Sequence, residues 1–165
     1  MKNKEKVYTV ATIVLIIDQI VKLVVKNNID LMEEIEVIPK FFSICYLEND
    51  GAAFSVLSGK TYIFVIVGFI LLFMLDRFIK KERLTNLSKI SLGIIIGGIV
   101  GNLVDRLLYH SVIDFLSFNI FGYSFPVFNI ADIGITVGVG LYIIENVWRS
   151  ISEVRSRNRR KIKNR

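Results

Sequence analysis

Four long apolar segments, separated by polar connections, dominate the pattern of residues along the chain. They lie at about residues 7–25, 61–79, 88–108 and 127–148. A helix rises about 1.5 Å per residue, so segments of this length approach or match the roughly 30 Å hydrocarbon core of a bilayer. The pattern therefore predicts an α-helical integral membrane protein with four transmembrane helices, forming a single membrane domain over residues 1–165.

Small residues recur within the last two apolar segments. Gly93, Gly97 and Gly101 follow one another at intervals of four residues, and Gly134 and Gly138 repeat that spacing. Residues four apart lie on one face of a helix, and small residues there let a second helix approach closely. We therefore expect the third and fourth helices to pack tightly against neighbours.

The polar connections differ in character. Residues 27–60 include an alternating stretch at 35–38, a β-prone run at 41–47 and a turn signal at 48–51, which together predict a small β-rich subdomain between the first and second helices. Residues 52–54 are expected to dip back to the membrane surface. Residues 109–126 form the second connection on the same side, and the basic tail at 149–165 is expected to be disordered near anionic lipid.

Composition and charge support a membrane location and give it a direction. The chain has 165 residues, 53% of them hydrophobic, with a mean hydropathy of +0.54, which is more apolar than a soluble domain of this size. Of its 21 Lys and Arg residues, 16 lie before the first helix, between the second and third, or in the tail. The positive-inside rule then places both termini in the cytoplasm and residues 27–60 and 109–126 outside. The net charge of +6 needs no nucleic-acid partner to explain it.

Polar residues interrupt the apolar pattern in five clusters that converge on the outer side. The clusters are Asp18 with Lys22, Asn49 with Gly51, Asn102 with Asp105 and Arg106, Asp114, and Asn129 with Asp132. An ionisable residue at a membrane costs a few kcal/mol on insertion scales, so such residues usually face a cavity and a partner. Structural ion pairs, Asp18 with Lys22 and Asp105 with Arg106, are the alternative explanation for those four residues.

Asp114 and Asp132 are the candidates for catalysis. No other charged residue lies between them, and neither has an adjacent cation in the sequence. Two carboxyl groups that share a partly dry site do not readily both ionise, so one keeps a proton. Such a pair can act as acid and base to activate water against a peptide carbonyl. With one histidine, His110, and one cysteine, Cys45, the chain has too few ligands for a zinc site of the usual kind.

The motifs themselves resemble a known family. They read DQIVK at 18–22, NDGAAF at 49–54, GGIVGNLVDR at 97–106, VIDF at 112–115 and FNIAD at 128–132. In this order, on four predicted helices, they are similar to the lipoprotein signal peptidases (signal peptidase II) of bacteria. The resemblance covers most of the chain.

The resemblance implies a function and a set of roles. It implies an aspartic endopeptidase of the bacterial inner membrane, without metal or cofactor, that cuts a prolipoprotein before a diacylglyceryl-modified cysteine and is blocked by globomycin. It assigns catalysis to Asp114 and Asp132. It assigns support of this pair, or contact with substrate, to Asp18, Lys22, Asn49, Gly51, Asn102, Asp105, Arg106 and Asn129. The expected partners are lipid-modified prolipoproteins and membrane lipids, and the protein is expected to be a monomer.

Two other classes of protein compete with this interpretation. A small transporter subunit or an assembly factor would carry polar residues across the whole depth of the bilayer, whereas these gather near one face. An intramembrane protease of the presenilin kind would carry YD and GxGD motifs, which this sequence lacks.

Overall fold

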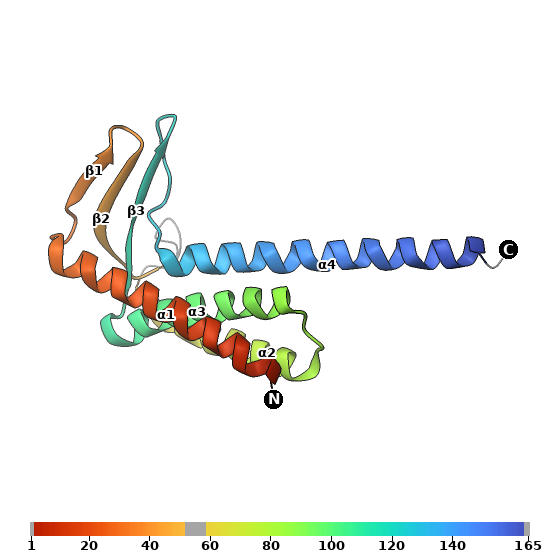
Figure 1. The fold of residues 1–165 in the computed structure, drawn as a ribbon. Coiled ribbons are helices and arrows are strands. Elements are labelled where there is room, and N and C mark those ends of the chain that lie inside the picture. The colour runs from red at the N-terminus through yellow and green to blue at the C-terminus, as the bar shows by residue number, and fades with distance from the viewer. Residues whose placement is uncertain (1, 52–58, 164–165) are drawn as a thin grey trace.

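The structure, a computed structural model, describes residues 2–51 and 59–163. Its elements are α1 (Lys2–Asn28), β1 (Glu34–Ile38), β2 (Phe42–Asn49), α2 (Thr61–Lys81), α3 (Asn86–Tyr109), β3 (Val112–Ile120), β4 (Tyr123–Ser124) and α4 (Ile130–Lys163). Four helices form a bundle with a sheet at one end, here called the sheet end (Figure 1). The expected approach of residues 52–54 to the membrane lies outside the described residues.

The prediction of four membrane-spanning helices is confirmed. The stretches Lys4–Asn28, Thr61–Lys81, Asn86–Tyr109 and Ile130–Ser156 are each long and apolar enough to cross a membrane. The fourth helix begins at Ile130 rather than near residue 127, because Phe128 still pairs with β3 in a β-bridge to Leu116.

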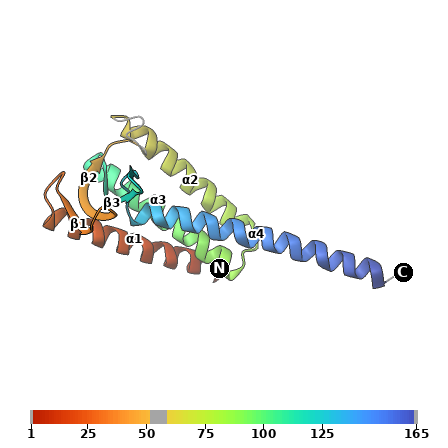
Figure 2. The ribbon, with the colours of Figure 1, turned by 90° about the horizontal axis from the view of Figure 1, so that it is seen from above.

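Helix α3 is the centre of the bundle. Its apolar window is 67% buried inside the molecule, against 11% for α2. A Cβ atom added at Gly97 would lie 2.6 Å from the Ala11 carbonyl oxygen of α1, and one at Gly98 would lie 2.4 Å from the Ala131 carbonyl oxygen of α4. The predicted close approach of helices at small residues is therefore confirmed, with α1 and α2 on either side of α3 and α4 (Figure 2).

The sheet draws its strands from both connections. It has the order β1-β2-β3-β4 with antiparallel neighbours, and its registers pair Glu34 with Cys45, Asn49 with Val112, and Ile120 with Tyr123. Strands β1 and β2 confirm the β-rich connection between the first two helices. No strand was predicted in residues 109–126, but β3 and β4 lie there.

The start of the β3 sequence lacks the alternation of apolar and polar residues that would predict a strand. Its first four residues, 112–115, are all buried, so the strand starts as a continuous run and does not alternate between apolar and polar positions. A short continuous run of that kind cannot be distinguished from a buried helical segment by its periodicity.

The prediction of a disordered tail is wrong for residues 149–163. Helix α4 continues through them to Lys163 and extends beyond the other helices (Figure 1). The stretch contains no Gly or Pro and many good helix formers, and it extends a helix that already exists. Adding residues to an existing helix avoids the cost of nucleation, which favours continuation of α4 through this stretch.

Two hydrophobic clusters hold the molecule together. One, made of Val7, Ala11, Ile79, Leu92, Ile95 and Ile96, joins the helices. The other, made of Val25, Tyr46, Ile113 and Phe115, joins the sheet to α1. The second cluster fixes β3 and its Asp114 against the bundle.

Candidate active site

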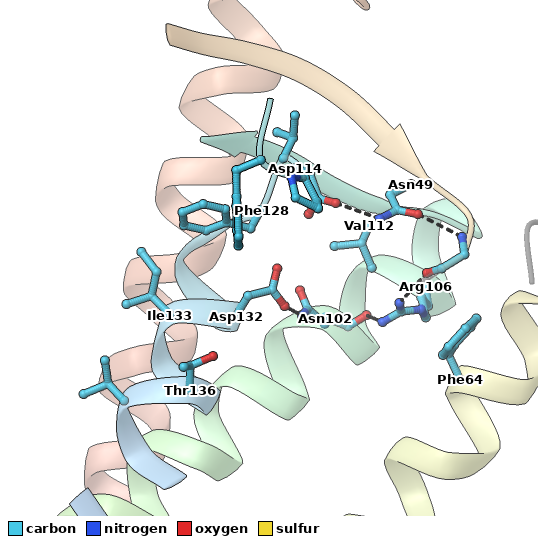
Figure 3. Close-up of a pocket in the computed structure, with 15 residues that line it drawn as sticks. Asn49, Phe64, Asn102, Arg106, Val112, Asp114, Phe128, Asp132, Ile133 and Thr136 are labelled. Atoms are coloured by element: carbon cyan, nitrogen blue, oxygen red, sulfur yellow. Dashed lines mark hydrogen bonds between the residues drawn. The ribbon is translucent and has the colours of Figure 1, made fainter. Parts of the chain in front are cut away.

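A cavity of about 630 Å³ lies at the sheet end, and both candidate aspartates line it (Figure 3). Its predicted site residues are Asn49, Gly51, Asn102, Arg106, Asp114 and Asp132. Its other lining residues are Phe64, Val112, Phe125, Pro126, Val127, Phe128, Ile133, Thr136 and Val137. A few polar groups thus converge in a largely apolar cavity, as in most ligand sites.

Asp132 is held by the first turn of α4. The Asn129 side-chain oxygen accepts a hydrogen bond from the Asp132 backbone N–H (3.0 Å), and the Asp132 carboxylate accepts one from the Asn129 backbone N–H (3.3 Å). This reciprocal pair is a capping box, which satisfies two N–H groups that have no partner within the helix. The start of α4 therefore fixes the position of this carboxylate.

Asp114 is held by two uncharged amides. Its side chain, on β3, is buried, and its two oxygens accept hydrogen bonds from the amide nitrogens of Asn129 (2.7 Å) and Asn49 (2.9 Å). Asn129 thus contacts both aspartates, one through its side-chain nitrogen and the other through its backbone and side-chain oxygen. The two carboxylates face one cavity from a strand and a helix.

Lys22 organises the polar groups behind the cavity. It is 1% exposed, its Nζ lies 2.9 Å from Asp18 and 2.8 Å from Asp105, and it donates to the Asn102 side-chain oxygen at 3.0 Å. Because an ammonium group can only donate, Asn102 must turn its oxygen toward Lys22 and its nitrogen away. That nitrogen donates to Asp132 at 2.7 Å. The buried cation thereby sets the direction in which Asn102 bonds to the aspartate.

The two carboxylates bound to Lys22 also position the backbone. Asp18 accepts a hydrogen bond from the Ala131 N–H at the start of α4 (2.8 Å), and Asp105 accepts one from the Ile113 N–H on β3 (3.2 Å). One carboxylate therefore holds the helix that carries Asp132, and the other holds the strand that carries Asp114.

The alternative of structural ion pairs is half correct. The Asp18–Lys22 pair forms, but Asp105 pairs with Lys22 and not with Arg106. Arg106 instead donates to the carbonyl oxygens of Asn102 (3.4 Å) and Gly51 (3.2 Å) and lies over the Phe64 ring, 4.9 Å from its centroid. Its Nε is buried without a hydrogen-bond partner among the described residues. The guanidinium thus contributes a positive charge to the cavity wall.

The polar network also includes Gln19, which belongs to the DQIVK motif but was not among the predicted site residues. Gln19 donates to Asp105 (2.8 Å), to Asp18 (3.3 Å) and to the Gly101 carbonyl oxygen (3.3 Å). It carries no charge, unlike Asp18 and Lys22 in the same motif. Its amide in the middle of an apolar helix was the available signal. The ten predicted site residues all lie in the cavity wall or in the network behind it.

Electrostatics set the protonation of Asp114. Burial, together with the charge of Asp132, raises the pKa of Asp114 to about 6, although the hydrogen bonds from Asn49 and Asn129 and the charge of Lys22 act in the opposite direction. A carboxyl with this pKa holds its proton closer to neutral pH than a free one does. The arrangement can therefore offer one carboxyl that gives a proton and one that takes a proton.

The side chains that commonly bind metal ions form no cluster in the part of the chain that the structure describes. Within residues 2–51 and 59–163, no group of three or more His, Cys, Asp or Glu side chains is placed to hold a metal ion. Cys45 lies in β2, within the β-prone run predicted at residues 41–47, and it is buried. Burial and the charges of Glu34 and Asp114 raise the pKa of its thiol to about 11.

Comparison with known proteins gives a consistent result. The family model described as signal peptidase (SPase) II matches residues 10–148. A lipoprotein signal peptidase of Staphylococcus aureus (strain JH9) is 40% identical over 136 residues, which cover 82% of this chain and 83% of the relative.

Solved structures agree with this match. A bacterial membrane enzyme determined by the in meso method at 2.3 Å resolution superposes with a TM-score of 0.79 at 38% identity, covering 87% of this chain and 88% of that one. A second, at 1.9 Å resolution, gives 0.75 at 39% identity, covering 84% and 90%. The family-model match, residues 10–148, includes both aspartates and the residues that line the cavity, and the chain belongs to the signal peptidase II family.

Proposed function

We propose that this protein is an aspartic endopeptidase that removes the signal peptides of prolipoproteins, with Asp114 and Asp132 as its catalytic pair. One observation carries the proposal: two carboxylates from different elements, each held by uncharged amide donors, line the same largely apolar cavity. Amide donors hold a carboxylate in place without forcing both members of the pair to ionise. A pair that keeps one proton is what acid and base catalysis requires.

The proposed substrate is held in the membrane. The similar proteins are lipoprotein signal peptidases. The proposed cut precedes a diacylglyceryl-modified cysteine, as the family resemblance of the motifs implies. The apolar side of the cavity includes Phe64 of α2 and Ile133 and Val137 of α4. These residues lie on membrane-spanning helices, so a lipid attached beside the scissile bond would find an apolar surface there.

The proposed reaction balances its protons within the pair. The ionised carboxylate takes a proton from water, the water oxygen attacks the peptide carbonyl carbon, and the protonated carboxyl gives its proton to the carbonyl oxygen. The resulting diol then returns a proton to the carboxylate that had protonated the carbonyl oxygen. The other carboxyl, which had taken its proton from water, protonates the amide nitrogen as the C–N bond breaks. The products are a carboxylic acid and a free amine, the pair again holds one proton, and neither metal nor cofactor takes part.

The supporting residues have separate proposed roles. Asn102, Asn129 and Asn49 hold the carboxylates, and Arg106 offers hydrogen-bond donors to polar groups of the substrate. Asp18, Lys22 and Asp105 hold the elements that carry the pair.

The orientation is also a proposal. The basic residues between α2 and α3 and at the end of α4 lie at the end of the bundle opposite the sheet. The positive-inside rule then places both termini in the cytoplasm and the cavity at the outer face of the bacterial inner membrane.

The test is cleavage of a diacylglyceryl-modified precursor by purified variants in lipid. Asp114→Asn and Asp132→Asn keep the size of the side chain but remove the exchangeable carboxyl proton, so each should abolish cleavage. The double variant should be no worse than either single one, because the two residues act as a unit. Asp30→Asn, at an exposed position outside the cavity, is the matched control and should retain full activity.

A different set of results would reassign the pair. Turnover like that of the native protein in Asp114→Asn or Asp132→Asn, with none in a well-folded Asp105→Asn, would mean that Asp105 is a catalytic residue. We expect Asp105→Asn to keep partial activity and to be less stable, since it weakens the bonds to Lys22 and to β3.

A further inference from the structure

The turn between β3 and β4 has an unusual residue at its tip. Ile120 and Tyr123 pair across the turn, and the two residues between them, Phe121 and Gly122, both have positive φ (52° and 86°). A two-residue turn of this kind strongly favours Asn, Asp or Gly, because a side chain with a Cβ is strained there. A phenylalanine at the first central position therefore works against the local fold.

The Phe121 side chain gains no burial within the chain that would offset this strain. The Phe121 side chain is fully exposed, with a relative exposure of 106%. Strain that persists without an internal contact points to a partner outside the chain.

Phe121 is part of a larger apolar surface. The neighbouring turn between β1 and β2 lies beside it, since the Asn119 N–H donates to the Phe41 carbonyl oxygen at 2.9 Å. The two turns together expose Ile38, Phe41, Ile120, Phe121 and Tyr123, here called the tip surface. Lys40, also exposed, lies within the same pair of turns.

The direction of the strands places the tip surface beside the bundle. The strands run across the direction of α4, and the turns project sideways, away from the helices (Figure 1). The sheet starts where α1 and α3 end, at Asn28 and Tyr109, so it begins at the level where these spans leave the hydrocarbon. A sheet that leaves the bundle sideways at this level runs along the membrane surface.

We propose that the tip surface inserts into the lipid interface of the bilayer beside the bundle. Aromatic side chains are enriched at this depth, and a lysine beside them can reach lipid phosphates. Phe121 lies seven residues from Asp114 along extended chain, more than roughly 20 Å at about 3.4 Å per residue, so this surface is separate from the cavity. It gives the sheet a second attachment to the membrane, in addition to the helices, and so fixes the height of the strand that carries Asp114.

The test uses tryptophan fluorescence in liposomes. Trp148 is the one tryptophan of the chain, so Trp148→Phe gives a silent background for Phe121→Trp. In vesicles of phosphatidylcholine and phosphatidylglycerol, the new tryptophan should emit at shorter wavelength, be quenched by lipids brominated high on their acyl chains, and resist iodide. Glu48→Trp, at an exposed position at the other end of β2, is the control and should show the opposite behaviour.

Two results would overturn the proposal. One is emission from Phe121→Trp that matches the Glu48→Trp control, with iodide quenching and no effect of brominated lipid. The other is protection from both quenchers that varies with the protein-to-lipid ratio, which would indicate contact with a second copy.

A stability measurement adds an independent arm. Phe121→Asn relieves the strain of the turn, so it should raise the midpoint of thermal unfolding in detergent. A lowered midpoint would show that Phe121 serves the fold itself, and would also overturn the proposal.

Discussion

At the scale of single residues, amide side chains hold the two carboxylates of the site. The buried cation, Lys22, is linked to Asp132 through the side chain of Asn102. Lys22 contacts Asp18, Asp105 and Asn102 directly, and reaches Asp132 only through the Asn102 amide. An adjacent cation would favour ionisation of both aspartates and remove the shared proton. The Asn102 amide therefore orders Asp132 without placing the Lys22 ammonium directly against it, which suits the proposed role of the pair in sharing one proton.

This distribution predicts the pH dependence of Asn49→Ala. The pKa of Asp114 is raised to about 6, and the Asn49 hydrogen bond is one of the groups that hold it down. In the free enzyme, kcat/KM should fall as pH rises through about 6, because the pair loses its shared proton. Removing Asn49 should raise this pKa and move the alkaline limb to higher pH.

The control for that experiment is Asn28→Ala. Its amide donates to the Val24 carbonyl oxygen on the exposed side of α1, so the pH profile should not change. An alkaline limb at the same pH in Asn49→Ala would mean that Asp114 is not the group that titrates.

Lys22→Met tests the energetic role of the buried cation. The change leaves Asp18 and Asp105 buried without their cation, and breaking a buried ion pair in this way typically costs about 3–5 kcal/mol. We expect a large drop in the thermal midpoint in detergent. Lys22→Met combined with Asp105→Asn removes one of the two stranded charges and should recover part of the loss. A single variant as stable as the native protein would contradict this role.

At the scale of elements, the features that could be predicted are those whose sequence pattern extends over many residues. A span shows itself over about twenty positions, and a carboxylate within it stands out, so the helices and Asp18, Lys22 and Asp105 could be predicted. The β3 strand could not, because burial on both faces removes its alternation. The Asp105–Lys22 pair could not either, since it depends on how closely α1 packs on α3.

The face of β3 that carries Asp114 gives a prediction about register. Successive strand residues point to opposite faces, so one Ala inserted between Ile113 and Asp114 turns the carboxylate away from the cavity. We expect cleavage to be lost. One Ala inserted after Gly122, in the β3–β4 turn, lengthens the same hairpin without moving Asp114 and should leave cleavage intact. Equal loss in both variants would mean that the hairpin tolerates no insertion at all.

At the scale of the whole molecule, the orientation can be measured with reporter fusions. The charge distribution predicts that reporters fused after Arg83 or Arg160 are active only in the cytoplasm, and that one placed near Glu34 is active only outside. Alkaline phosphatase and a fluorescent protein fold on opposite sides of the membrane and report the two locations. A cytoplasmic Glu34 would put the cavity on the wrong face for the proposed substrate.

The sheet that joins the two connections has a consequence for synthesis. Asn49 and Asp114, which bond across β2 and β3, are separated by 65 positions in the chain, and α2 and α3 lie between them. Asp132 follows later still, in the first turn of α4. A nascent chain whose first three spans have already emerged thus lacks one carboxylate and the cap that orients it. Under the proposed mechanism, in which Asp132 is one of the two catalytic carboxylates, a chain at this stage cannot cleave neighbouring precursors, and the active pair forms only once the start of α4 has been made.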